Sequence, residues 1–160
     1  MKKTFVSTVI TLLLLIVLAS AAFAAPAAGE RQLLLKGRVQ GAETATFFPT
    51  MFVVDGTGSG NATQLGLYTI NFRAEVDLST LSSSTSATVI AASGDRLFGE
   101  GTGQGSPTDD PNVTSVVENF TITGGTGRFA GASGNFTLER LVHLDSGLGS
   151  GTISGTIVLP

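Results

Sequence analysis

The stretch Phe120-Thr-Ile-Thr-Gly-Gly-Thr-Gly-Arg-Phe-Ala-Gly-Ala-Ser-Gly-Asn-Phe136 decides the fold of this chain. Apolar and polar residues alternate into it and alternate again as the chain leaves it toward Asp145, while glycines crowd the middle. A two-residue period is typical of a β-strand with one buried face, and clustered glycines mark a turn. The stretch therefore predicts two strands that pair as an antiparallel hairpin across a glycine-rich turn.

The same two-residue period recurs along the chain, and no run after the N-terminal leader keeps apolar residues at the spacing of an amphipathic helix. Eight strands are predicted, at residues 31–40, 44–54, 64–78, 85–92, 95–103, 114–123, 133–145 and 150–159. Their apolar faces predict one core, which includes Ile70, Phe72, Val76, Phe120, Ile122, Phe136, Leu138 and Ile153.

The links between these strands indicate how the strands are arranged. Links such as 93–94 and 145–149 are too short for a crossover helix, so successive strands are expected to be antiparallel neighbours. The longer segment 103–112 contains Pro107 and Pro111 and is predicted to be a surface loop. We expect an all-β fold, an eight-stranded antiparallel up-and-down barrel, because closure removes exposed sheet edges. A two-sheet β-sandwich is the alternative, and periodicity does not distinguish the two.

Residues 1–24 have the pattern of a secretory signal peptide. Two lysines near the N-terminus precede an apolar run at 9–18, which is followed by the small-x-small site Ala22-Phe-Ala24. The run is shorter than a transmembrane helix requires, and no stop-transfer sequence follows it. The sequence predicts an exported protein, secreted or periplasmic, that is cleaved near Ala24 and has no membrane span after processing. Residues 25–160 are expected to form a single β-barrel domain.

Composition and charge exclude several classes of partner and stabilising bond. The chain has no cysteine, so neither a disulfide nor a cysteine-linked lipid anchor exists, and a packed core must stabilise the domain. Removal of Lys2 and Lys3 with the leader changes the formal net charge from −3 to −5. This charge argues against a nucleic acid or an anionic membrane as partner.

The glycine-rich turn has a structural interpretation of its own. Its backbone is expected to adopt positive φ angles and to approach neighbouring strands closely, while Phe129 folds inward as a plug at the barrel end. A nucleotide-binding loop is the alternative, but that loop requires a following helix and a parallel sheet, whereas residues 133–145 alternate as a strand. The predicted structural turn consists of Gly124, Gly125, Gly127, Phe129, Gly131 and Gly134.

Ile122-Thr-Gly-Gly-Thr-Gly-Arg-Phe-Ala-Gly-Ala-Ser-Gly134 resembles a turn of the allene oxide cyclase and dirigent families, and the match extends over roughly residues 114–145. Gly60-Asn-Ala-Thr-Gln-Leu-Gly-Leu-Tyr68 is similar to a segment of bacterial secreted barrel proteins, with Gln64 in place of a histidine. The resemblance implies an eight-stranded antiparallel barrel. The catalytic residues of those families lie on other strands, where this chain matches no motif, so no reaction is implied.

Glu118 and Arg140 each lie on an otherwise apolar face of the two strands that flank the turn. If Ile122 pairs with Phe136, the register places Glu118 opposite Arg140 inside the barrel. A buried ion pair is weak evidence for stability, because both charges lose their hydration. One hypothesis makes the pair the polar floor of a ligand cavity, in which Arg140 holds an anionic group and Glu118 orients it. The other makes it a structural pair near a barrel mouth.

Other polar residues give weaker signals. His143 falls on the polar face of its strand and is expected to face solvent, since no second histidine or cysteine completes a metal site. Asp109 and Asp110 are interpreted as a solvated acidic turn, because the ordered oxygen spacing of a calcium loop is missing. No metal or cofactor is expected. No catalytic residue is identified, and the sequence leaves open whether the chain is an enzyme.

Two classes of function fit the sequence. The first is a non-enzymatic secreted barrel that binds a small apolar ligand or self-associates as an envelope component. The second is a cyclase-like or isomerase-like enzyme that acts on a flexible apolar substrate in the barrel cavity. The absence of a recognisable acid–base pair favours the first. The barrel interior distinguishes a ligand-binding protein from a structural one. Ligand chemistry requires a cavity on the order of several hundred Å³ that reaches Glu118 and Arg140, whereas a structural role is expected if side chains fill the interior.

Overall fold

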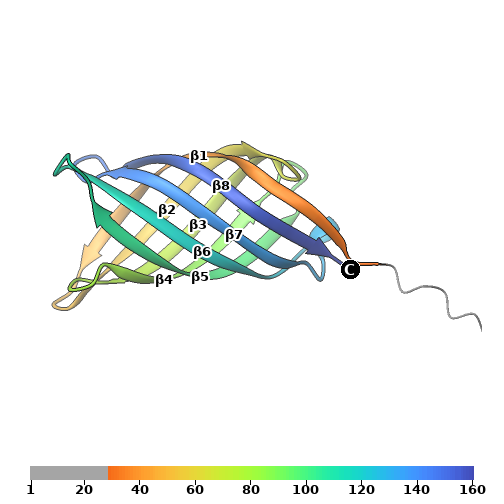
Figure 1. The fold of residues 1–160 in the computed structure, drawn as a ribbon, viewed down its shortest axis with the longest axis horizontal. Coiled ribbons are helices and arrows are strands. Elements are labelled where there is room, and N and C mark those ends of the chain that lie inside the picture. The colour runs from red at the N-terminus through yellow and green to blue at the C-terminus, as the bar shows by residue number, and fades with distance from the viewer. Residues whose placement is uncertain (1–28) are drawn as a thin grey trace, which may run out of the picture.

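The computed structural model describes residues 29–160, which form a closed antiparallel barrel whose strands follow one another in chain order (Figure 1). β1 pairs with β8, so the ring is complete and the β-sandwich alternative is wrong. The predicted signal peptide, residues 1–24, lies outside the described residues. The strands are β1 (Arg31–Phe47), β2 (Met51–Ala62), β3 (Gly66–Asp77), β4 (Ser82–Ile90), β5 (Arg96–Pro107), β6 (Val113–Gly125), β7 (Ser133–His143) and β8 (Leu148–Leu159).

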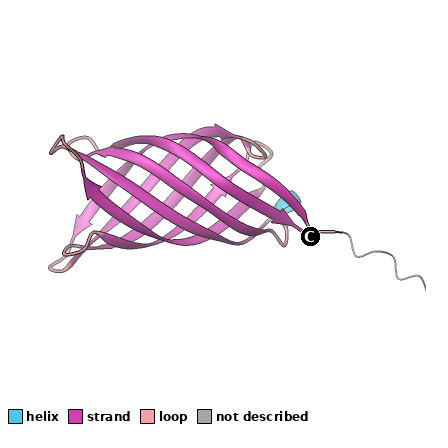
Figure 2. Cartoon of the chain, in the orientation of Figure 1, coloured by secondary structure: helices cyan, strands magenta, loops and turns pink. Residues whose placement is uncertain are grey.

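The barrel has two unlike ends (Figure 2). The tip end carries the strand connections 48–50, 78–81, 108–112 and 144–147. The terminal end carries the start of β1, the C-terminus and the connections 63–65, 91–95 and 126–132. The last of these contains the short 3-10 helix η1 (Gly127–Phe129). In the described part of the chain, we find no helix that is long and apolar enough to cross a membrane.

Three strands extend further than the sequence predicted. The predicted second strand, 44–54, is wrong because the 48–50 connection lies inside it, and β2 begins at Met51 and continues to Ala62. β1 continues to Phe47, although a turn was expected near Gly41, and β5 continues to Pro107, although a loop was expected from residue 103. Gly41 faces the interior, where the Thr57 carbonyl oxygen lies too close for a side chain, so its glycine maintains the pairing of β1 with β2. Pro107 is the last residue of β5, and strand ends tolerate proline.

Glycines at alternate positions face the barrel interior along three strands. The Phe72 ring occupies the space that a Cβ atom on Gly56 would take, and the Phe120 ring lies 2.9 Å from the position of a Cβ on Gly101. The Phe72 and Phe120 rings therefore lie over the glycines with which they pair on the neighbouring strands β2 and β5. The inward glycines of these three strands are Gly56, Gly58 and Gly60 on β2, Gly99, Gly101, Gly103 and Gly105 on β5, and Gly149, Gly151 and Gly155 on β8.

The predicted core residues are buried, with Phe72 partly exposed, but they form two clusters instead of one. The larger cluster fills the terminal half, where the rings of Phe120 and Phe136 stack with centroids 4.6 Å apart. Val76 belongs to a smaller cluster with Val54 and Ala74, toward the tip end. Phe72 packs against both clusters and connects them.

Candidate functional site

Glu118 and Arg140 both point into the barrel, as the alternation predicted, but the predicted register is wrong by two residues. Phe136 pairs with Phe120 instead of Ile122, which places Glu118 opposite Leu138 and Arg140 opposite Val116. A shift of two residues keeps every side chain on its predicted face. The two charges are therefore diagonal neighbours, and they still form an ion pair, with 3.2 Å between Arg140 Nε and Glu118 Oε2.

A third charge, which the sequence interpretation missed, completes the group. Arg140 Nη1 donates a hydrogen bond to Glu43 Oε2 from β1, on the opposite side of Arg140 from Glu118. The side chains of Glu118, Arg140 and Glu43 are only 1%, 10% and 16% exposed, respectively. One guanidinium thus bridges two carboxylates inside the barrel, and we call these three residues the interior charge cluster.

Hydroxyl groups of β4 extend the interior charge cluster to the far wall. Thr85 Oγ1 donates a hydrogen bond of 3.2 Å to Glu118 Oε1, and Thr85 is itself buried. The Ser83 hydroxyl lies 3.4 Å from that of Thr85. Among the described residues, every fully buried side-chain nitrogen or oxygen has a hydrogen-bond partner. Every fully buried polar atom of the cluster is therefore paired, as a buried polar network requires if it is to stabilise a fold.

The surroundings of Arg140 hold it in its charged form. Burial acts to lower the pKa of Arg140, but the charges of Glu118 and Glu43 outweigh burial, and the pKa lies above its ordinary value. The guanidinium carbon also lies 4.8 Å from the centroid of the Phe72 ring, a cation–π distance. The arginine is fixed by two carboxylates and a ring, so it is poorly placed to exchange these partners for an incoming anion.

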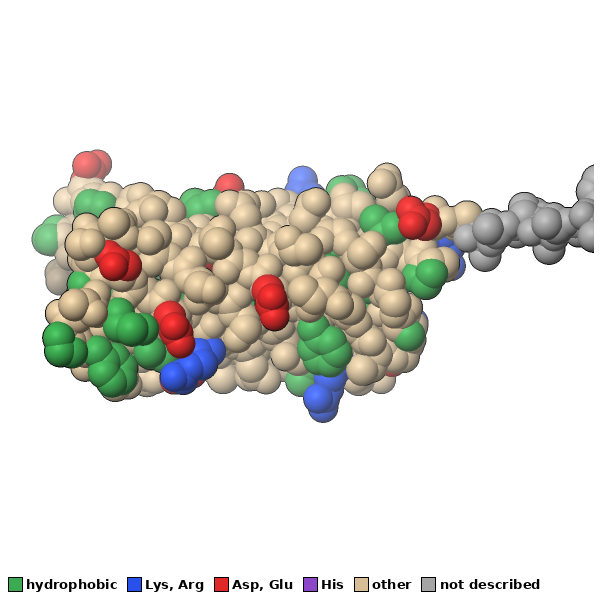
Figure 3. All heavy atoms as spheres, turned by 90° about the horizontal axis from the view of Figure 1, so that it is seen from below, with side chains coloured by type: hydrophobic (Ala, Val, Ile, Leu, Met, Phe, Trp, Pro, Cys, Tyr) green, Lys and Arg blue, Asp and Glu red, His purple; other side chains and the backbone are tan. Residues whose placement is uncertain are grey.

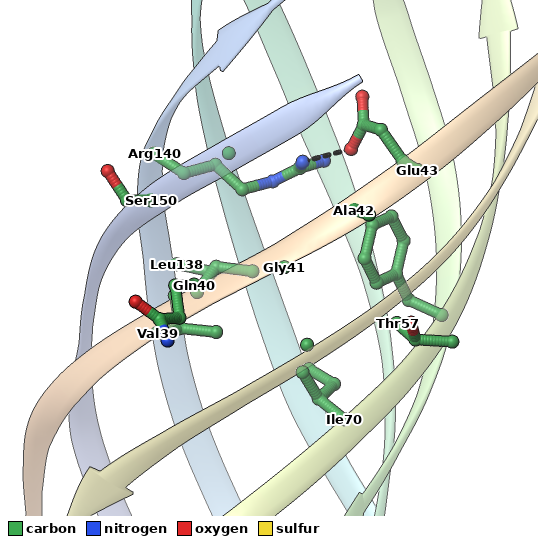
Figure 4. A pocket seen from close by; sticks show the side chains of 13 residues that line it. Val39, Gln40, Gly41, Ala42, Glu43, Thr57, Ile70, Leu138, Arg140 and Ser150 are labelled. Carbon is green, nitrogen blue, oxygen red and sulfur yellow. Dashed lines mark hydrogen bonds and ion pairs between the residues drawn. The ribbon is translucent and has the colours of Figure 1, made fainter. Parts of the chain in front are cut away.

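A small cavity lies beside Arg140 and Glu43, whose paired side chains are drawn in Figure 4. The cavity that Arg140 and Glu43 border has a free volume of about 20 Å³, and Phe72, Leu138 and Ile70 close it on the apolar side. About one water molecule fits such a volume. This cavity is thus far smaller than the several hundred Å³ that binding of a small organic ligand requires. Larger hollows lie on the outer wall, over β1, β2, β3 and β8, and they are open to solvent.

The glycine-rich turn closes the terminal end. Phe129 is buried against the main core, as predicted, and φ is positive at Gly124, Gly127, Gly131 and Gly134. Gly125 does not have a positive φ; its role is close approach, because the Arg96 carbonyl oxygen and Phe129 leave no room for a side chain.

The two sequence segments that resembled known barrels meet at this end. Arg128 Nη2, from the glycine-rich turn, donates a hydrogen bond of 2.6 Å to the Gln64 carbonyl oxygen. Nearby, Tyr68 donates a hydrogen bond of 3.1 Å to the Arg38 carbonyl oxygen, and burial raises the pKa of Tyr68 to about 12. These contacts have a structural explanation, since the first joins the connections 126–132 and 63–65 and the second joins β3 to β1.

The remaining polar candidates do not assemble a reactive site. His143 is exposed, as expected, and Asp109 and Asp110 are exposed in the 108–112 connection. In residues 29–160, no three His, Cys, Asp or Glu side chains gather as metal ligands would. The Asp110 carboxylate instead accepts a hydrogen bond of 2.9 Å from the Asn112 amide, which is a turn contact.

An exposed apolar group at the tip end is the feature that the sequence interpretation overlooked. Phe47 is 69% exposed and Phe48 is 48% exposed, although the Phe47 ring stacks on Phe52 at 5.3 Å. Leu78 is also exposed, and its amide donates to the Thr50 carbonyl oxygen, which joins the two connections. We call Phe47, Phe48, Phe52 and Leu78 the apolar tip. Figure 3 shows hydrophobic side chains gathered at the tip end, at the left.

Comparison with solved structures establishes the fold. The structure of the pterocarpan synthase dirigent protein GePTS1 superimposes with a TM-score of 0.62 over 84% of this chain and 94% of that chain, at 14% sequence identity. The chain has the fold of a dirigent protein. The resemblance inferred from the glycine-rich turn is therefore confirmed for the dirigent-like barrel, while similarity to allene oxide cyclases stays a prediction. No protein-family model and no curated protein matches the sequence.

Proposed function

We propose that this chain is an exported, non-enzymatic barrel that acts through its outer surface and self-associates through the apolar tip. The observation that carries the proposal is the filled interior, because the cavity beside Arg140, about 20 Å³, is too small for an organic ligand. Export rests on the signal-peptide pattern of residues 1–24. In this proposal the interior charge cluster is structural, and the function lies outside the barrel.

The apolar tip supports self-association because its exposure is costly to a monomer. Phe47 and Phe48 are adjacent, and together with Leu78 they expose large apolar surface at one end of the barrel. Exposed groups of this kind mark interaction sites in soluble proteins. Aromatic side chains also contribute strongly to association, since each buries a large area with few rotatable bonds.

Sedimentation velocity over a range of concentrations tests self-association. The protein is purified after export from cells that express the full 160-residue chain. We expect a mass that rises with concentration in the parent and stays that of a monomer in the double variant Phe47→Ser/Phe48→Ser. The matched control is Val117→Ser/Leu141→Ser, which removes two exposed apolar side chains from the outer wall of β6 and β7. A parent that is monomeric at every concentration, or a control that behaves like the tip variant, would contradict the proposal.

A small apolar ligand, bound or converted inside the barrel, is the second candidate. It is favoured by one observation: the cavity lies between the charge of Arg140 and the apolar side chains of Leu138 and Ile70. A ligand would have to displace Arg140 from both carboxylates to enlarge the cavity. Native mass spectrometry of the exported protein separates the candidates, because surface action predicts the mass of the bare chain, whereas a retained small molecule that unfolding releases supports the second.

A further inference from the structure

Charge is distributed unevenly along the barrel axis. If each strand is divided at its midpoint, the tip half of residues 29–160 contains nine acidic and two basic side chains, a net charge of −7. The terminal half contains three acidic and five basic side chains, a net charge of +2. Glu75 and Asp77 lie beside the apolar tip, whereas Asp55 pairs with Arg73. The basic side chains of the terminal half are Arg31, Lys36, Arg38, Arg96 and Arg128.

The basic side chains of the terminal half are available to a partner. Arg31, Lys36, Arg38 and Arg96 are exposed, and none of them forms a salt bridge within the described residues. Arg128 is the exception, since its Nε lies 3.6 Å from Asp95 Oδ2. Apolar surface accompanies these charges, because Leu34 and Leu67 are exposed on either side of the 63–65 connection.

We propose that the apolar tip of one copy binds the basic terminal end of the next copy, so that barrels associate head to tail. This inference rests on the proposed self-association and specifies its geometry. The partner of an apolar surface surrounded by carboxylates must be basic and partly apolar, and the terminal end of the same chain has both properties. An anionic membrane surface is disfavoured by the same carboxylates.

Head-to-head pairing is disfavoured by the charge of the tip half. Glu43, Glu118 and Arg140 lie inside the barrel, so the remaining side chains of each tip half, seven acidic and one basic, carry a net charge of −6. Two such halves would face each other in a head-to-head dimer, and like charges brought together at an interface oppose association. Head-to-tail contact joins opposite charges instead. This contact uses a different surface on each of the two copies. An assembly of copies therefore has a free tip at one end and a free terminal end at the other, and it grows into a filament unless it closes as a ring.

Two variants, each blocked at one end, distinguish these geometries. The tip variant is Phe47→Ser/Phe48→Ser, and the terminal variant is Arg31→Glu/Lys36→Glu/Arg96→Glu, which reverses three exposed charges. Head-to-tail association predicts that each variant alone is monomeric by sedimentation velocity, with affinity reduced at least about tenfold. A 1:1 mixture should form a heterodimer and nothing larger, because the terminal variant supplies an intact tip and the tip variant supplies an intact terminal end. The parent should form larger species, and added salt should weaken them.

Other outcomes separate the failure of this inference from that of the proposed self-association. A terminal variant that dimerises as well as the parent would show head-to-head pairing and overturn the inference while self-association through the tip stands. A mixture that stays monomeric, from a parent that associates, would also overturn it. A monomeric parent that binds phosphatidylcholine vesicles through Phe47 and Phe48 would assign the apolar tip to lipid and overturn both. Circular dichroism of each variant confirms that the barrel is folded.

Discussion

The two halves of the barrel interior are filled in different ways. The terminal half holds aromatic and aliphatic side chains around Phe120 and Phe136, each of which contributes in proportion to its buried area. The tip half holds the interior charge cluster, whose buried carboxylates are tolerable there because each of them pairs with Arg140. Loss of one side chain therefore leaves a void in the first half and an uncompensated charge in the second.

Removal of Arg140 is the change with the largest expected effect. Arg140→Met leaves Glu118 and Glu43 close together without a counter-charge, and we expect a loss of about 3–5 kcal/mol in the free energy of unfolding. Urea denaturation measures it. Replacing all three charges, as Glu43→Leu/Glu118→Leu/Arg140→Met, should recover much of the loss, since well-packed apolar residues often substitute for buried ions without cost. A single variant as stable as the parent would show that the cluster is exposed in solution.

Phe136→Ala tests the apolar half in the same assay. The Phe136 ring is buried and stacked on Phe120, so its removal should lower the free energy of unfolding by about 3–5 kcal/mol through lost burial and the cavity left behind. No second substitution of a charged residue should restore the lost stability, because the loss comes from an apolar void. A change within about 0.5 kcal/mol would mean that the assignment of faces on β7 is wrong.

Glu118→Gln should have a smaller effect than Arg140→Met. Glu43 still neutralises Arg140 in this variant, and the amide keeps the size of the carboxylate, so the expected loss is about 1–3 kcal/mol for the charged hydrogen bonds to Thr85 and Arg140. The difference between the two losses in the free energy of unfolding measures how much Glu43 alone stabilises the charge of Arg140. Equal losses would indicate that Glu43 does not pair with Arg140.

Asp77, in the tip half but on the surface, gives the smallest expected effect. Its carboxylate accepts hydrogen bonds from Ser79 and Thr80, which lower the pKa of Asp77 from 3.8 to about 2. Because the pKa is lowered on folding, the stabilisation is present above pH 3.8 and is lost as the pH falls through about 2. An NMR titration of the side-chain carboxyl should have its midpoint near 2, and a midpoint near 3.8 would show that the turn is open.

Strand number, strand faces and most of the core could be predicted from sequence because a two-residue period depends only on neighbouring positions. Register could not. The ladder between β6 and β7 ends at Thr121 and Asn135, because the rest of β6 pairs with β5 alone and the connection folds through η1. The predicted register, which matched apolar residue to apolar residue by placing Ile122 opposite Phe136, was therefore wrong by two residues, although the faces were right.

The missed member of the charge cluster follows from a misinterpreted glycine. Gly41 was taken for the start of a turn, which removed Glu43 from the first strand. Leu35 and Val39 point inward, and the same alternation through Gly41 places Glu43 on the inner face. Glycines at two-residue spacing, as in 56–60 and 99–105, were the available signal that strands continue and that their inner face is narrow.

The central claim is that the barrel is filled inside and acts from outside, and the triple variant Glu43→Leu/Glu118→Leu/Arg140→Met tests it most directly. Sedimentation equilibrium of the exported protein compares its association constant with that of the parent. Because the change is confined to the interior, the account predicts a folded variant that associates as the parent does. A triple variant that keeps the barrel by circular dichroism but no longer associates would contradict the account, because function would then depend on the interior charges.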